Sequence, residues 1–157
     1  MKVLGIDPGT HRIGWGIIEG NINSQSAIEY NCIELPKHTK QDVYLPRIYK
    51  EIKKLLTKHK PDLVGIEKIF FQKNKKTATI VAQARGVIIL AVSQANTAFI
   101  ELSPNTIKST VAGSGRADKE QVVDMTCLLL NISEKPKLDD TTDALATAIT
   151  ALVIKGK

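Results

Sequence analysis

The stretch KVLGIDPGTHRIGWGIIE, residues 2–19, sets the frame for the fold. Apolar residues dominate 2–7 and 12–19, and the Pro-Gly-Thr sequence between them is typical of a tight turn that joins two strands. A third strand is predicted over 26–35. Three consecutive strands with short connections predict an antiparallel meander at the start of the chain.

A basic amphipathic helix is predicted next, with Pro46 as an early residue and an end before Pro61. Apolar residues recur at helical spacing at Ile48, Ile52 and Leu55, while lysine and arginine occupy most of the other positions. The basic face of this 46–59 helix is either a surface that contacts DNA or an ordinary solvated exterior.

Strands and helices alternate through the rest of the chain. A short apolar strand covers 63–66, and the apolar segment 77–95 is predicted to be helical, although its β-branched residues leave a strand as the alternative. A strand over 97–102, a helix starting at Ser103-Pro104, a flexible loop over 113–118, a helix over 119–130 and a last helix over about 141–154 follow. This order predicts an α/β fold: a mixed five-stranded sheet flanked by helices, in a single domain over 1–157.

The composition is that of a folded basic protein. The 157 residues carry 22 Lys and Arg against 16 Asp and Glu, and the resulting net charge of +6 favours a polyanionic partner. Neither a signal peptide nor a membrane span is predicted, and a cytoplasmic location is expected. Cys32 and Cys127 lack metal-ligand spacing and are interpreted as reduced thiols. His11, His38 and His59 are scattered; none is expected to bind a metal, and only His11 is expected near the site.

Acidic residues gather where apolar segments begin or end. Asp7 and Glu67 each end an apolar strand, where a charge is costly unless it is neutralised. Asp140 and Asp143 lie three residues apart at a helix start, so they share one face. Taken singly, Asp7 is explained as a turn residue and the helix aspartates as capping or dipole-complementing residues; for Asp139 we expect capping. If the strands are neighbours and the helix crosses their ends, four carboxylates converge into a site for Mg²⁺ or Mn²⁺.

Such a cluster points to phosphodiester chemistry. Two divalent ions roughly 4 Å apart can activate a water molecule and stabilise the leaving oxygen of a phosphodiester displacement. A basic protein with this site is therefore expected to act on a nucleic acid.

Five stretches, taken in order, resemble the RuvC family of Holliday junction resolvases. They are GIDPGTHRIGWG at 5–16, GIEKIFFQKN at 65–74, QARG at 83–86, GSGRADK at 113–119 and DDTTDALA at 139–146. Together they span nearly the whole chain, which makes the resemblance more specific than any one motif.

The resemblance implies a ribonuclease-H-like nuclease and a homodimer. It implies symmetric, Mg²⁺-dependent cutting of four-way DNA junctions during homologous recombination and DNA repair, with two ions per active site and Mn²⁺ as a substitute. It also implies a complex with a branch-migration helicase. The catalytic and metal-binding acids of the family correspond to Asp7, Glu67, Asp140 and Asp143. For the dimer interface the candidate is 77–92, although burial within one chain explains the same residues.

The remaining predictions concern contacts with DNA. Phe70 and Phe71 follow Glu67 and are flanked by lysines; adjacent phenylalanines are often half buried, but one of them can stack on an unpaired base, and the resemblance favours Phe70. The resemblance also places phosphate contacts at Lys108 and at Lys119, which starts a helix after the 113–118 loop. Further contacts are expected from Lys73, Lys76 and Arg116. Arg85 either contacts DNA or forms a structural ion pair.

Three other functions compete with this interpretation. GIDPGT also resembles the phosphate-binding turn of actin-like and chaperone-like ATPases, but those proteins need a second lobe. A junction-binding protein without catalysis would not need the complete acidic set. Another ribonuclease-H-like nuclease, acting on RNA–DNA hybrids or branched DNA, would use the same acids.

Overall fold

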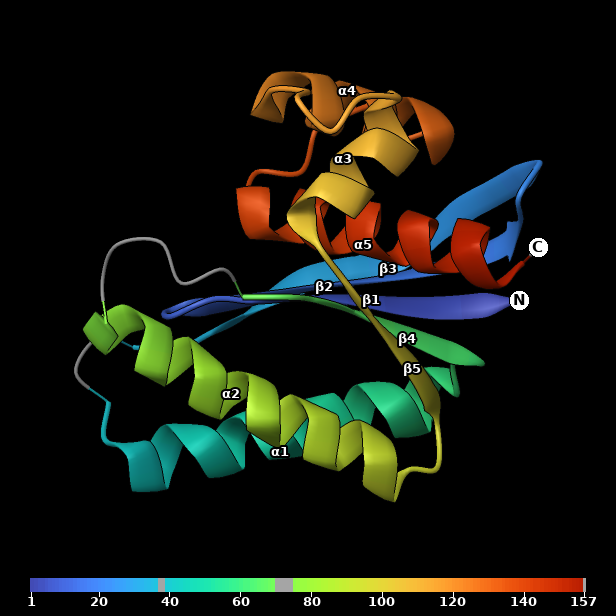
Figure 1. The fold of residues 1–157 in the computed structure, drawn as a ribbon. Helices are drawn as coiled ribbons and strands as arrows, with labels where there is room; N and C mark the ends of the chain where they lie inside the picture. Colours follow the sequence, from blue (N-terminus) through green and yellow to red (C-terminus); the bar gives the residue numbers. More distant parts are fainter. Residues whose placement is uncertain (37–38, 70–74, 157) are drawn as a thin grey trace.

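The structure is a computed structural model that describes residues 1–36, 39–69 and 75–156 (Figure 1). Its strands are β1 (Lys2–Pro8), β2 (Arg12–Asn21), β3 (Ser24–Glu34), β4 (Leu63–Glu67) and β5 (Ala98–Leu102). Its helices are α1 (Gln41–His59), α2 (Lys75–Gln94), α3 (Pro104–Ala112), α4 (Lys119–Leu129) and α5 (Asp139–Lys155). No helix among these residues is both long and apolar enough to cross a membrane.

The strands form one mixed sheet in the order β3-β2-β1-β4-β5. β1, β2 and β3 pair antiparallel, whereas β4 runs parallel to β1 and β5 runs parallel to β4. The predicted meander and the mixed five-stranded sheet flanked by helices are confirmed. The segment whose β-branched residues left a strand possible is helix α2.

Helices cover both faces of the sheet (Figure 1). α1 and α2 lie on one face, where Leu4 and Ile6 of β1 pack in a buried cluster with apolar residues of both helices. α5 lies on the other face with α3 and α4 beyond it, and Val3 of β1 belongs to this second cluster. Because β1 is buried from both sides, its sequence is a continuous apolar run rather than an alternating one.

α5 approaches the sheet closely because glycines face it. A β-carbon on Gly5 would lie 2.0 Å from the carbonyl oxygen of Ala144, and one on Gly14 would lie 1.8 Å from that of Asp140. No side chain fits in either place, so the absence of a β-carbon is required for this packing. The start of α5 is thereby held against β1 and β2.

Three helices begin earlier than predicted, and α2 does so by two residues, at Lys75. α1 begins at Gln41, so Pro46 lies within the helix, where it removes one backbone hydrogen bond near the helix start. α5 begins at Asp139, and the capping prediction for this residue is wrong: the N-cap position is Leu138, with no side-chain cap. Ser103 and Asp118 do cap α3 and α4, each by accepting a hydrogen bond from a backbone N–H.

Candidate active site

The acids at the ends of β1 and β4 lie at one edge of the sheet. The two strands run parallel with Ile6 opposite Ile66, so Asp7 and Glu67 follow at the same level. α5 starts above this edge and adds Asp143 (Figure 1). Asp7, Glu67 and Asp143 line one cavity of about 310 Å³, together with Lys108, Lys119 and the apolar wall residues Pro104, Ile107 and Val122. The predicted convergence of acids and lysines is therefore present for five of the predicted residues.

Asp140 lies beside this cavity rather than in its wall. Its Oδ2 is 3.3 Å from Nε of Arg12, which lies at the start of β2. The charge of Asp140 nevertheless acts on Asp7 and contributes to raising the pKa of that residue. Arg12 was not assigned a role from the sequence, although it lies inside the GIDPGTHRIGWG stretch; its neighbour His11 is exposed.

Burial and mutual repulsion shift the carboxyl groups of the cavity. Burial first, and then the charges of Glu67, Asp143 and Asp140, raise the pKa of Asp7 well above its ordinary value. Burial and the charge of Asp143 raise the pKa of Glu67 to about 7, while a hydrogen bond with Asp7 works in the opposite direction. Burial also raises the pKa of Asp143, and Lys119 opposes that shift. Near neutral pH the cluster therefore retains protons that isolated carboxyl groups would lose.

Two lysines supply positive charge to the cavity. Lys119 Nζ lies 2.8 Å from Asp139 Oδ2 and 3.7 Å from Asp143 Oδ2. Lys108 Nζ donates a hydrogen bond to the carbonyl oxygen of Ala117 at 2.8 Å, which fixes the lysine against the loop before α4. Asp139 thus pairs with Lys119 instead of capping its helix.

The donor set suits a hard divalent cation. Among the described residues, no three acidic, histidine or cysteine side chains are already arranged to hold one ion. Each of the four acids has another partner instead: a second carboxyl group, Lys119 or Arg12. Carboxylate oxygens are the ligands that Mg²⁺ and Mn²⁺ prefer, and a cation would favour the charged form of groups whose pKa is raised here. The residues therefore fit such an ion once these pairs open.

The other residues predicted to contact DNA do not line the active-site cavity in the part of the chain that the structure describes. Arg116 is exposed and lines a separate hollow beside α4. Arg85 forms an ion pair with Glu101 of β5, which is the structural alternative considered above, and its DNA contact stays a prediction. Phe70, Phe71 and Lys73 lie outside the described residues, as does the side chain of Lys76.

Comparison with known families gives one match over nearly the whole chain. The model of the family described as crossover junction endodeoxyribonuclease RuvC matches residues 3–151. A protein of that name from Heliobacterium modesticaldum is 44% identical over 149 residues, which cover 95% of this chain and 92% of the relative. One from Caldicellulosiruptor saccharolyticus is 45% identical over 150 residues, covering 95% and 90%.

A solved structure agrees with these matches. The structure of Thermus thermophilus RuvC in complex with a Holliday junction substrate superposes with a TM-score of 0.90 and 28% identity, covering 96% of this chain and 92% of that one. The fold described above is therefore the fold of a protein that has been seen with a four-way junction.

Proposed function

Because this chain belongs to the family of crossover junction endodeoxyribonucleases RuvC, we propose that it resolves four-way DNA junctions by cutting two symmetrically placed phosphodiester bonds. Its fold is accordingly ribonuclease-H-like, as the resemblance implied. The observation that carries the proposal is one cavity in which acids from β1, β4 and α5 meet two lysines. Recombination and DNA repair are the processes that supply such junctions, and we place the activity in the cytoplasm.

Asp7, Glu67, Asp140 and Asp143 are the proposed ligands of Mg²⁺, with Mn²⁺ as a substitute and two ions per site. Bound ions would lower the pKa of a water molecule and stabilise the leaving oxygen. What supports this assignment is the chemistry of three of the donors: burial first, and then the charges of neighbouring carboxylates, raise the pKa values of Asp7, Glu67 and Asp143.

The lysines of the cavity have a different role. Lys119 is held in place by two aspartates and Lys108 by a backbone carbonyl, so each lysine nitrogen has a defined position at the cavity wall. We assign both to the phosphates next to the cut bond, where a preorganised cation stabilises charge without reorganisation. Phe70, with Phe71 as the alternative, is proposed to stack on an unpaired base.

A homodimer would give a two-fold junction two identical sites. Support for an interface comes from α2, where Ala82, Gly86 and Leu90 are spaced four residues apart and all exposed, Leu90 to 50%. Phe99 of β5 is also exposed, to 38%. Small residues along a helix allow close helix contact, and a large apolar side chain gives the contact area. A branch-migration helicase is a further proposed partner, on family resemblance alone.

Cleavage of three substrates tests the proposal. A labelled four-way junction, a linear duplex and an RNA–DNA hybrid would be incubated with and without Mg²⁺. The chains compared are the native protein, Asp7→Asn and the control Asp42→Asn, an exposed acid in the first turn of α1. We expect paired nicks in the junction alone, lost in Asp7→Asn and kept in Asp42→Asn, while junction binding persists in all three.

The same experiment decides between the alternatives. Binding without cleavage in the presence of Mg²⁺, and equally when Mn²⁺ replaces it, would identify a non-catalytic junction binder. Cleavage of the hybrid alone would identify a ribonuclease of the same fold. The ATPase alternative has lost its support, because the family match is to nucleases over 3–151.

A further inference from the structure

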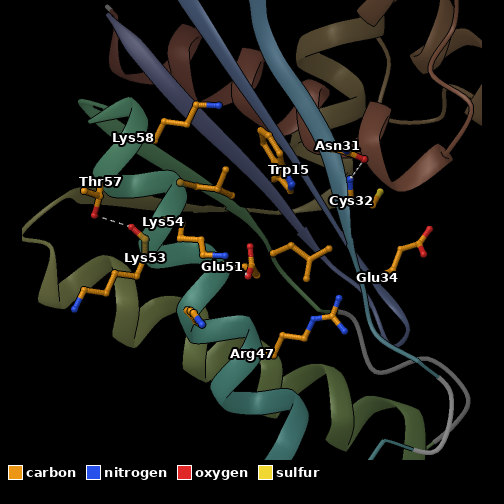
Figure 2. A pocket seen from close by; sticks show the side chains of 13 residues that line it. Trp15, Asn31, Cys32, Glu34, Arg47, Glu51, Lys53, Lys54, Thr57 and Lys58 are labelled. Carbon is orange, nitrogen blue, oxygen red and sulfur yellow. Dashed lines mark hydrogen bonds and ion pairs between the residues drawn. The ribbon is translucent and has the colours of Figure 1, made fainter.

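A long groove lies between β3 and α1, on the face of the sheet that α1 covers. Its volume is about 1020 Å³, which exceeds the active-site cavity. Figure 2 shows α1 with its basic side chains on one side and β3 with Asn31, Cys32 and Glu34 on the other, with Trp15 between them. β3 ends the sheet order, so nothing in the described sheet extends beyond this side.

The groove is predominantly basic. Five cationic side chains of α1 line it, against two carboxylates, Glu34 and Glu51. Lys54 pairs with Glu51 and Lys58 with Glu29, so these two lysines are already neutralised. Arg47, Lys50 and Lys53 are exposed and have no ion-pair partner among the described residues. Glu34 is the one lining carboxylate without an ion-pair partner among the described residues, so these three cations leave the hollow positively charged, which favours a polyanion.

The groove begins next to the catalytic edge. Glu34, at its end, is the cross-strand partner of Arg12, and Arg12 reaches Asp140. Cys32, which also lines the groove, lies with Sγ 3.1 Å from Oγ1 of Thr141, the residue after Asp140. One strand pair therefore lies between this end of the groove and the acids.

We propose that this groove holds the phosphate backbone of a duplex arm of the junction, beyond the crossover. This inference rests on the proposed function and extends its substrate contact from the cut bond to the arm. From Arg47 to Lys58 the helix runs about 16 Å at 1.5 Å per residue. One DNA strand carries a phosphate about every 3.4 Å of axis, so this length matches about five phosphates. The three free cations then replace counterions of the arm.

An acidic segment of a protein is the competing occupant. It would use the same cations and could pair with the free edge of β3. The arm is favoured because the groove leads away from the acids that cut DNA, so that a bound junction already brings phosphates to its end.

Junctions with two arm lengths test the inference. One has arms of about 20 base pairs, roughly two helical turns, and the other has arms of about 4 base pairs, about 14 Å of axis, closed by hairpin loops, which are too short to fill the groove. Binding by fluorescence anisotropy over a range of salt concentrations would be measured in the Asp7→Asn background, so that nothing is cut. The groove variant carries Arg47→Gln, Lys50→Gln and Lys53→Gln. Its matched controls are Lys50→Arg with Lys53→Arg, which keeps the charge, and Lys155→Gln at the exposed end of α5.

For the groove variant we expect about tenfold weaker binding of the long-armed junction. The slope of log affinity against log salt should fall by about 2 to 3, close to 0.9 for each lost phosphate contact. Binding of the short-armed junction, and its cleavage when Asp7 is restored, should be unchanged, as should binding by both controls. Circular dichroism would establish that the variant is folded.

Three results would overturn the inference. Equal loss on both junctions would place these cations at the crossover, and no loss on either would make the groove an ordinary solvated surface. If the groove variant bound both junctions normally but no longer bound a labelled polyglutamate peptide that the native chain binds, the groove would be reassigned to an acidic protein segment. Failure of the native chain to bind any junction would instead remove the proposed function, and this inference with it.

Discussion

Gly14 of β2 and Asp140 of α5 are in direct backbone contact: a β-carbon on Gly14 would lie 1.8 Å from the Asp140 carbonyl oxygen. The short distance between α5 and the sheet is therefore possible only because Gly14 has no β-carbon. Because Asp140 and Asp143 both lie in the first turns of α5, the same contact sets the distance of two acids from Asp7. A packing feature of β2 thus determines the geometry of the active site.

Gly14→Ala should therefore affect stability and catalysis together. The added methyl group has to displace backbone rather than a flexible side chain, and we expect about 2 kcal/mol lower unfolding free energy. Cleavage of a junction at a temperature where the variant is folded should fall about 100-fold, because the acids on α5 move relative to those on the strands. The control is Gly115→Ala, whose β-carbon would meet its nearest atom at 3.6 Å. Normal cleavage by a folded Gly14→Ala would show that α5 can shift without cost.

Lys119 is predicted to tune the acids as well as to contact phosphate. Its charge lowers the pKa values of Asp7 and Asp143, so in Lys119→Gln both pKa values should rise further. We expect a cleavage rate at least tenfold lower and an acid limb of the pH–rate profile displaced to higher pH. In Lys119→Arg the acid limb of the pH–rate profile should stay at its native position, because arginine keeps the positive charge. Lys135→Gln, which loses only a pair with Asp124, should leave the profile in place, and a similar displacement in that control would point to a general charge effect.

The sequence was informative where charge breaks an apolar run. Asp7 and Glu67 stand out because each ends a buried strand, and a charge there needs neutralisation whatever the tertiary structure. The pairing of β1 with β4 then brings them together. Hydrophobic periodicity alone could not decide whether the α2 segment is a helix or a strand, because β-branched residues suit a strand as well as a buried helix. In the structure the segment is a 20-residue helix that packs with α1 in one buried cluster.

Other features depended on contacts that no local pattern contains. Aspartate is a residue type that often caps helices. Asp139 instead forms an ion pair with Lys119, twenty residues earlier, and it is the first residue of α5 rather than its N-cap. Arg12 reaches Asp140 only because the start of β2 lies beside the start of α5. Arg85 finds its partner on β5. In each case the local sequence allows more than one role for the residue, and a side chain from a distant element determines which role it has.

Leu90 provides a test of the dimer. It is 50% exposed on α2, so Leu90→Lys should change the stability of one chain by only about 0.5 kcal/mol. In a homodimer it would place two charges in an apolar contact, and sedimentation velocity should show a monomer. Junction cleavage should then give unpaired single nicks. The matched control is Leu128→Lys on α4, where the leucine is 68% exposed. A dimer that persists in Leu90→Lys would place the interface elsewhere.

The buried acids should make the metal-free protein less stable as the pH rises. Burial, followed by the charge of Asp143, raises the pKa of Glu67 from 4.5 to about 7, so the folded chain binds this proton more tightly than the unfolded chain. The stabilisation is complete below pH 4.5 and is lost as the pH rises through about 7. Relative to Glu67→Gln, the native chain with EDTA should lose roughly 3 kcal/mol of unfolding free energy across this window.

Urea unfolding at a series of pH values would measure this loss, with the exposed Glu134→Gln as control. Adding Mg²⁺ at pH 8 should restore stability to the native chain and less to Glu67→Gln, because an ion that binds only the folded state stabilises it by mass action. Parallel pH curves for the native chain and Glu67→Gln would mean that Glu67 ionises freely. The buried carboxyl cluster would then not be the group that a metal ion neutralises.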